Sequence, residues 1–337
     1  MFLTIALSTV ASASTAVMPG VARGQMPRDS ARVERPRSRI RATLADSTFW
    51  PEGVDADPRN GRLYVASIRH RTIAEIDANG RTRELLPRDG KTLGPIFGVR
   101  VDTARNVVWA TTSAYHQIPG FMPADTAIAA LLEIRIADGA IIRRWNAPIA
   151  PGGRVLGDLA IAPNGTVFFT DSNHPVMYWM NPRTGVVDSI TSVAFRSLQG
   201  VAPTQDGRFV YIADYSRGFF RLELATRALS LVEAPPGMSM RGCDGILWYR
   251  GSIIAVQNGT SPARVMRFTL DSTGTRFTRA DVVDENPHIA DEPTIATLLG
   301  RELIYVANSQ WEKHDAHGSR IETRPLTAPI LLSVPLP

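Results

Sequence analysis

The sequence contains a single cysteine, Cys243, so no internal disulfide is possible. No helical periodicity of useful length is present, and no Walker, glycine-rich dinucleotide or zinc-protease pattern occurs. The phrase "GMSM" around Ser239 does not form a nucleophile elbow, because Arg241 replaces the final glycine. Charged residues make up only 20% of the chain, whereas apolar residues reach 44%, enough to build a core.

The net charge of +5 is confined to one segment. Residues 21–45 hold seven arginines against Asp29 and Glu34, which accounts for the whole excess. A basic segment on a neutral body is typical of a solvated linker, so we expect no nucleic-acid partner. The first residues, "MFLTIALSTVASASTAV", are too short and too weakly apolar to span a membrane and resemble the apolar region of a signal peptide, without its positive start. We therefore expect a signal peptide at 1–25, a disordered basic linker at 26–40, and export from the cytoplasm.

Six stretches of the remaining chain follow one pattern. Each has a short strand, a turn bearing Gly or Asn, and a second strand rich in Val, Ile, Phe and Tyr, which is typical of a β-hairpin. The stretches are 52–68, 97–113, 157–172, 199–215, 244–258 and 293–309. A third strand-like run follows each pair and a fourth follows most of them, as in "ALLEIRI" and "IIRRWNA". Four strands in each repeat predict a β-propeller.

The sixth repeat ends at Pro337 without a fourth strand, whereas the strand-like run "IRATLADSTF", residues 40–49, precedes the first repeat. We expect this run to supply the missing outer strand and to close the ring, because closure removes exposed sheet edges. The prediction is an all-β, six-bladed β-propeller with four-stranded blades over residues 41–337. An open array of hairpins is the less favoured alternative.

Acids at the start of several repeats indicate a site. The first strand of each blade begins at the central channel, so Glu52, Asp158 and Asp244 are expected to meet at one mouth. Carboxylates brought together repel one another unless a cation lies between them, and oxygen ligands suit calcium above magnesium. Gln199 adds an amide oxygen, and Asp244 is a candidate base for activating water. Each acid alone is more simply explained as a turn cap.

Loops that follow the second strands carry further candidates. His116, His174 and His314 are expected near the same mouth, although loop histidines are commonly solvated surface residues. The pair in "HDAH", His314 and His317, has no third ligand in sequence that would indicate zinc. Long loops at 113–127 and 309–320 are expected to wall the mouth.

The chain resembles the family of senescence marker protein, gluconolactonase and luciferin-regenerating enzyme. The resemblance covers most of residues 50–337 and rests on "PEGVDADPRNGRLYVAS", "GDLAIAPNGTVFFTD", "QGVAPTQDGRFVYIADY" and "CDGILWY". It implies a six-bladed propeller, commonly a calcium-dependent lactonase or related esterase. It also implies that Glu52 and Asp244 are metal ligands, that Asp244 is the base, and that Asp158 lies near metal and substrate.

Two positions depart from the family pattern. Gly157 stands where the family has an Asn near the metal, and Gln199 stands where it has a ligand Asn. Two hypotheses therefore remain at this stage. One is a metal-dependent hydrolase of a small lactone or ester, with Glu52, Gln199 and Asp244 as ligands. The other is a non-catalytic propeller that binds a small ligand, a sugar or a protein at the same face.

Overall fold

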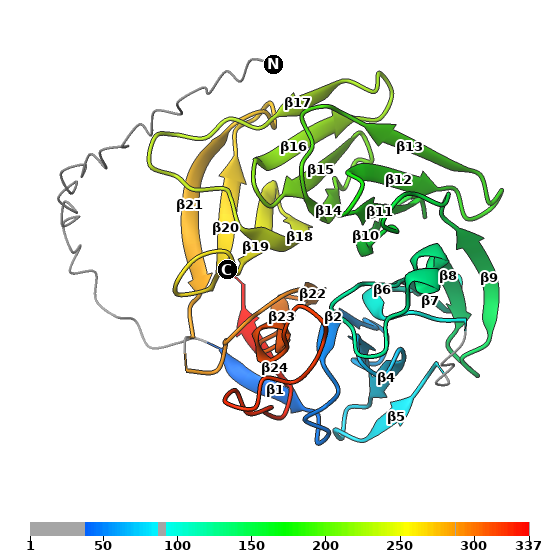
Figure 1. The fold of residues 1–337 in the computed structure, drawn as a ribbon. Coiled ribbons are helices and arrows are strands. Elements are labelled where there is room, and N and C mark those ends of the chain that lie inside the picture. Colours follow the sequence, from blue (N-terminus) through cyan, green and yellow to red (C-terminus); the bar gives the residue numbers. More distant parts are fainter. Residues whose placement is uncertain (1–37, 87–91, 287, 337) are drawn as a thin grey trace, which may run out of the picture. The chain divides into compact units, whose positions relative to one another are not determined.

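A computed structural model describes residues 38–86, 92–286 and 288–336. Its strands form six four-stranded antiparallel sheets arranged as blades around a centre (Figure 1). This confirms the prediction of a six-bladed β-propeller. The expected signal peptide at 1–25 and most of the expected linker lie outside the described residues.

Each of the first five blades is one continuous segment of chain. Blade 1 consists of β2 (Pro51–Ala56), β3 (Leu63–Ser67), β4 (Ile73–Ile76) and β5 (Thr82–Glu84). Blade 2 consists of β6 (Ile96–Asp102), β7 (Val107–Ser113), β8 (Ala129–Arg135) and β9 (Ile141–Asn146). Blade 3 consists of β10 (Leu156–Ile161), β11 (Val167–Asp171), β12 (Val176–Met180) and β13 (Val187–Thr191). Blade 4 consists of β14 (Leu198–Pro203), β15 (Phe209–Asp214), β16 (Gly218–Glu223) and β17 (Leu229–Leu231). Blade 5 consists of β18 (Cys243–Tyr249), β19 (Ser252–Gln257), β20 (Arg264–Leu270) and β21 (Phe277–Asp284).

Blade 6 is assembled from both ends of the described chain. It contains β22 (Ala296–Leu299), β23 (Glu302–Val306) and β24 (Ile330–Pro335), and its outer strand is β1 (Arg39–Thr43). Strand β1 pairs antiparallel with β24, with Arg39 opposite Ser333 and Thr43 opposite Ile330. The expected closure by an N-terminal strand is therefore confirmed, and this strand begins two residues before the expected boundary at 41.

Apolar clusters fill the spaces between neighbouring blades. Val107 and Trp109 of β7 pack towards blade 3, whereas Val108 and Ala110 pack towards blade 1. Both faces of such a strand are buried, which explains why the second strand of each repeat is a continuous apolar run and not an alternating one. The same arrangement recurs at each of the other junctions around the ring.

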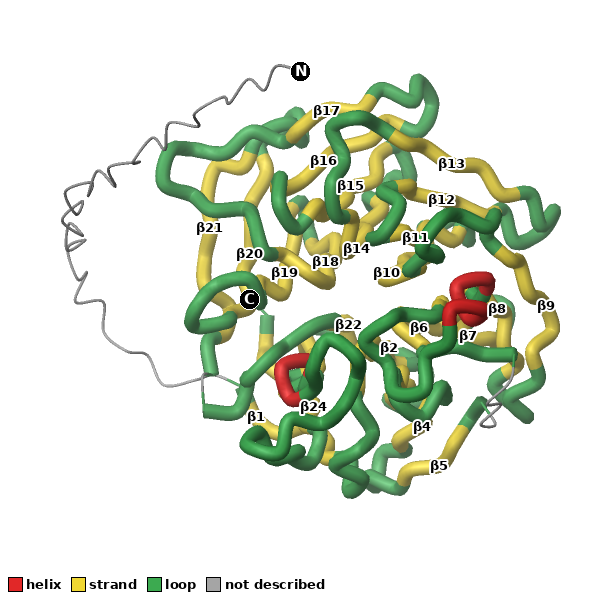
Figure 2. Tube along the Cα trace, viewed as in Figure 1, coloured by secondary structure: helices red, strands yellow, loops and turns green. Residues whose placement is uncertain are grey.

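Helix is limited, within the described residues, to two short 3-10 turns, Pro123–Ala127 and Trp311–Lys313 (Figure 2). Both lie in long loops, one between β7 and β8 and the other between β23 and β24. No helix in this part of the chain is long and apolar enough to cross a membrane. The regular sheets form the frame of the ring, and the two long loops extend from it.

Candidate functional site

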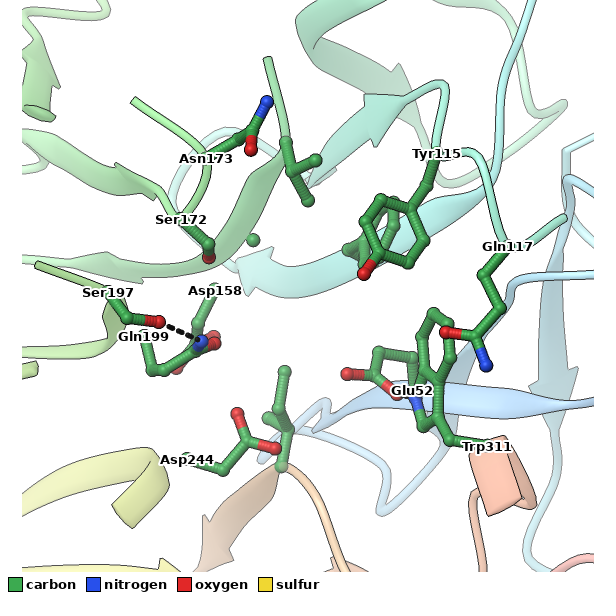
Figure 3. A pocket seen from close by; sticks show the side chains of 14 residues that line it. Glu52, Tyr115, Gln117, Asp158, Ser172, Asn173, Ser197, Gln199, Asp244 and Trp311 are labelled. Carbon is green, nitrogen blue, oxygen red and sulfur yellow. Dashed lines mark hydrogen bonds between the residues drawn. The ribbon is translucent and has the colours of Figure 1, made fainter. Parts of the chain in front are cut away.

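A cavity of about 420 Å³ lies where the first strands of the blades begin. It is lined by the residues that open blades 1 to 5: Glu52, Phe97, Gly157 with Asp158, Gln199 and Asp244. The expected metal ligands and the expected base thus share one cavity. Figure 3 shows their side chains surrounding an open space, with Glu52 facing Asp158 and Gln199, and Asp244 on a third side.

A β-bulge in the first strand of each of blades 1 to 5 orients these residues towards the cavity. The register between the first and second strands shifts in each of blades 1 to 5, at the residues that carry the site, for example between Pro51 and Val54 and between Cys243 and Ile246. Such bulges bend a strand and redirect side chains. In blade 1 the residue after Glu52 is Gly53, which lets β2 lie close to β6 of blade 2. A Cβ at Gly53 would lie 2.3 Å from the carbonyl oxygen of Phe97.

Asp158 occupies a different position from the other acids. Counted from the shifted pair, Glu52, Gln199 and Asp244 are the first residues, and Gly157 is their equivalent in blade 3. Asp158 was expected to be equivalent to Glu52 and Asp244. It lies one residue further along its strand than that. That step brings it to Arg100 of β6, whose Nη2 donates to Asp158 Oδ1 at 3.2 Å.

The Arg100–Asp158 pair is buried below the cavity. Arg100 Nη1 also donates to the carbonyl oxygens of Val54, at 3.1 Å, and Val99, at 2.9 Å. Burial raises the pKa of Asp158, and the Arg100 charge opposes that rise. The second carboxylate oxygen, Oδ2, is buried and has no hydrogen-bond partner. An orphaned acceptor of this kind is costly unless a ligand or ion satisfies it.

Asp244 is held in a fixed orientation by blade 5. Asn258 Nδ2 donates to Asp244 Oδ2 at 2.9 Å and to the carbonyl oxygen of Pro293 at 2.9 Å. Tyr215 in turn donates its hydroxyl hydrogen to Asn258 Oδ1 at 3.0 Å, which fixes the amide. Burial raises the pKa of Asp244 to about 7, repulsion by Asp158 adds to the rise, and the Asn258 hydrogen bond opposes it. A carboxylate with this pKa can accept a proton near neutral pH.

Glu52 lies opposite and is bonded to the indole of Trp311, whose Nε1 donates to Glu52 Oε2 at 2.7 Å. Burial raises the pKa of Glu52 well above its usual value, and the charge of Asp244 raises it further. Glu292 does not line the cavity, although its charge also raises the pKa of Glu52. The site therefore concentrates acidic groups that raise one another's pKa values, and Arg100 opposes this rise at Asp158.

The three candidate histidines do not line this cavity. His116 is exposed, and with His174 it borders a smaller adjacent cavity of about 310 Å³. His314 is buried, where its ring stacks on Trp50 at 3.7 Å between centroids and its Nδ1 lies 3.1 Å from the carbonyl oxygen of Gln310. His314 thus supports the wall of the mouth, whereas His116 and His174 belong to a neighbouring recess.

The donor set suits a hard cation in its chemistry. No hydrogen bond within the described residues occupies Glu52 Oε1 or Asp244 Oδ1, and Asp158 Oδ2 is orphaned. These oxygens, with the Gln199 amide, are ligands that calcium accepts in irregular geometry. Gln199 is turned by a bond from its Nε2 to Ser197 Oγ at 3.3 Å. In the part of the chain that the structure describes, no three His, Cys, Asp or Glu side chains gather closely enough to hold a metal by themselves.

Some residues of the site escaped the sequence analysis. Trp311, Tyr115 and Arg100 each contact a candidate residue or line the cavity. The loops that carry Trp311 and Tyr115 were expected to wall the mouth, but the individual side chains were not identified. Arg100 is a charged residue between two valines in the first strand of blade 2, and that anomaly is the signal that could have revealed it.

Comparison with known proteins supports the fold. No family model matches the sequence. No curated protein matches it either. Among solved structures, virginiamycin B lyase from Staphylococcus aureus is 14% identical, with a TM-score of 0.56 over 80% of this chain and 81% of that chain. A gluconolactonase from Xanthomonas campestris is 15% identical, with a TM-score of 0.58 over 90% of this chain and 96% of that chain.

A luciferin-regenerating enzyme is 12% identical, with a TM-score of 0.59 over 89% of this chain and 95% of that chain. Gluconolactonase and luciferin-regenerating enzyme are members of the family that the sequence resembles. The lyase performs different chemistry on a similar ring, so the likeness does not determine a reaction. The suspected resemblance is confirmed for the fold: this chain shares the propeller architecture of these proteins.

Proposed function

We propose that this protein hydrolyses a small lactone or ester at the channel mouth, with the help of a divalent cation, for which calcium is the favoured candidate. The observation that carries the proposal is the convergence of Glu52, Asp158 and Asp244 around one cavity, where the buried Arg100 pairs with Asp158. The gluconolactonase-like neighbours agree with this reaction class. Export of the chain belongs to the same proposal and rests on residues 1–25 alone.

Glu52, Gln199 and Asp244 are the residues that would hold the cation, with Asp158 close by. A bound cation would supply Lewis-acid polarisation of the substrate carbonyl oxygen. The residues of the chain contribute orientation: Trp311 occupies one oxygen of Glu52, and Asn258 occupies one oxygen of Asp244. One oxygen of each carboxylate therefore remains for the cation or the substrate.

Asp244 is the proposed base. Its carboxylate accepts a proton from a water molecule while the water oxygen bonds to the substrate carbonyl carbon. The carbon–oxygen bond of the ester or lactone then breaks, and the proton on Asp244 passes to the departing alkoxide. Without a cation, burial raises the pKa of Asp244 to about 7; a bound cation would lower this pKa and keep the carboxylate ionised, able to accept the proton.

A non-catalytic binding protein is the second candidate function. Gly157 contributes no side chain where the resembled family has an Asn, and Gln199 stands in place of the ligand Asn. Gln199 Nε2 also donates a hydrogen bond to Ser197 Oγ. Only the amide oxygen of Gln199 therefore remains as a cation ligand. Weak or absent cation binding would favour this candidate.

Calorimetric titration with CaCl₂ and a hydrolysis panel of lactones and aryl esters test the proposal. We expect wild-type protein to bind calcium and to hydrolyse at least one substrate, and Asp244→Asn to lose turnover by roughly 10²-fold or more. Asp188→Asn, at an exposed residue of strand β13, is the matched control and is expected to retain both properties. Retained turnover in Asp244→Asn would refute the role of this base, and absence of both binding and hydrolysis would favour the binding protein.

A further inference from the structure

The candidate cavity has two chemically different sides. Phe97, Tyr115 and Trp311 come from blades 2 and 6 and form an aromatic wall on the side of Glu52. Ser172, Ser197 and Gln199 come from blades 3 and 4 and face this wall across the open space (Figure 3). An amphipathic molecule would match both sides, with an apolar ring against the wall and polar atoms towards the opposite side.

The aromatic wall is built by mutual packing and not by isolated surface rings. Trp311 contacts Trp50 edge to face at 5.0 Å between centroids and Tyr115 at 5.8 Å. It lies nearly parallel to Phe97, with centroids 6.4 Å apart. Trp50 is in turn stacked on the buried His314 ring. These contacts limit the rotamers of Trp311 and so preorganise the wall.

The backbone before Trp311 is also fixed. Gln310 is buried and adopts a left-handed conformation with φ of 72°. Its Nε2 donates to the carbonyl oxygen of Ser47 at 3.0 Å, and its Oε1 accepts from the backbone N–H of Thr327 at 2.8 Å. The side chain thus ties the start of the 3-10 turn to two other segments. A residue held in this strained conformation by its surroundings commonly serves a site.

The indole N–H of Trp311 is already bonded to Glu52 Oε2. Trp311 therefore offers a ligand its ring and no free donor. Among the described residues on this side, the polar side-chain atoms that remain for a ligand belong to Tyr115 and Gln117, together with Glu52 Oε1 where no cation occupies it. A polyhydroxylated ring placed against the wall would lose hydrogen bonds to water without replacing most of them, which is unfavourable.

We propose that Trp311 is a specificity-determining residue and that the site selects lactones or esters bearing an aromatic or similarly flat apolar ring over polyhydroxylated sugar lactones. This inference rests on the proposed function for the lactone or ester group, but the preference for the ring rests on the wall alone. The two can therefore be tested separately.

Binding of hydrolysis-resistant lactams provides the test. In a lactam, nitrogen replaces the ring oxygen of the lactone, so affinity can be measured by calorimetry whether or not the protein is a catalyst. The probes are 3,4-dihydroquinolin-2-one, which carries an aromatic ring, and gluconolactam, which carries hydroxyl groups, both in the presence of CaCl₂. We expect the aromatic lactam to bind at least ~10-fold more tightly, the scale of one favourable aromatic contact.

Variants identify the wall as the cause. Trp311→Ala is expected to reduce the affinity ratio by roughly fivefold or more, whereas Trp311→Phe retains the ring and most of the ratio. Tyr115→Ser, in the other loop, is a second wall variant in case Trp311→Ala fails to fold, and is expected to lower the ratio as well. Trp179→Ala is the control, because Trp179 packs on Phe168 in blade 3 and lines none of the cavities described above.

Equal affinities, tighter binding of gluconolactam, absence of binding by both lactams, or a ratio unchanged in Trp311→Ala and Tyr115→Ser would each overturn the inference. Selective binding of the aromatic lactam without hydrolysis of any lactone or ester would leave the inference standing and refute the proposed hydrolysis. Hydrolysis of both lactone types without a preference would support the proposed hydrolysis and refute the inference about the ring.

Discussion

Replacement of Arg100 by methionine tests how the charges below the site are balanced. The Arg100 and Asp158 side chains lie in a buried pair, with residue exposures of 6% and 3%. Methionine fills most of the same volume but removes the guanidinium. Asp158 then keeps the N–H of Leu159, at 2.8 Å, as a hydrogen-bond donor to its Oδ1. Removal of one partner of a buried ion pair typically lowers the free energy of unfolding by about 3–5 kcal/mol.

The loss in Arg100→Met depends on pH in a defined direction. Burial already raises the pKa of Asp158, and removal of the nearby positive charge raises it further. An acid with a raised folded-state pKa contributes stability that is fully present below its unfolded pKa and is lost as pH rises through its folded pKa. The difference between wild type and Arg100→Met is therefore expected to be larger at pH 8 than at pH 5.

Urea denaturation followed by circular dichroism, in EDTA at both pH values, measures this difference. Asp158→Asn in the Arg100→Met background is expected to recover part of the loss, because the unpaired charge is gone. Arg135→Met is the control: Arg135 pairs with Asp138 at the surface, and the two side chains are 48% and 51% exposed. Such a pair contributes about 0–1 kcal/mol. If Arg100→Met costs no more than Arg135→Met, or costs the same at both pH values, the reasoning is wrong.

Three further predictions concern the cavity. Gly200→Ala is expected to lower the free energy of unfolding, measured by urea denaturation, by about 1–3 kcal/mol, because the added Cβ would lie 2.5 Å from the carbonyl oxygen of Asp244. Gly157→Ala is expected to be tolerated in the same assay, because the atom nearest to its Cβ is 3.4 Å away. In EDTA the free energy of unfolding is expected to fall as pH rises through about 7, since burial raises the pKa values of Asp244 and Glu292 to about 7; a flat profile in urea titrations would contradict this. Asn258→Ala is expected to move the acid limb of the pH–rate profile to higher pH, because it removes the hydrogen bond that lowers the pKa of Asp244; an unchanged midpoint would exclude that role.

The fold could be predicted because its signals are local. Turn residues such as the Asn164–Gly165 pair and apolar runs such as 167–169 specify hairpins within a few residues, and their recurrence specifies the blades. The closing role of β1 followed from counting strands, since the last repeat lacked one. The two-sided burial of each second strand accounts for the apolar runs that the repeats share.

The site could be predicted only in part. Equivalent positions in the repeats indicated that Glu52 and Asp244 would converge, because the ring brings each first strand to one axis. Asp158 lies one residue beyond the equivalent position, Gly157, and the local sequence did not reveal that this step pairs it with Arg100. The contact between Trp311 and Glu52 joins residues 259 positions apart, through a loop whose path depends on the packing of three blades. The same limit applies to His314, which is buried under the wall.

The pairing of β1 with β24 joins residues 294 positions apart, as in the hydrogen bond from Arg39 to Ser333. A polypeptide emerging from the ribosome cannot complete this sheet until its final strand has been synthesised, so the last blade is the natural point of delay in folding. Joining residues 38 and 336 through a short linker, while opening a hairpin turn in another blade, would preserve every strand neighbour. In such a circular permutant a different blade would be assembled from the two ends of the chain, and that blade would be expected to fold last.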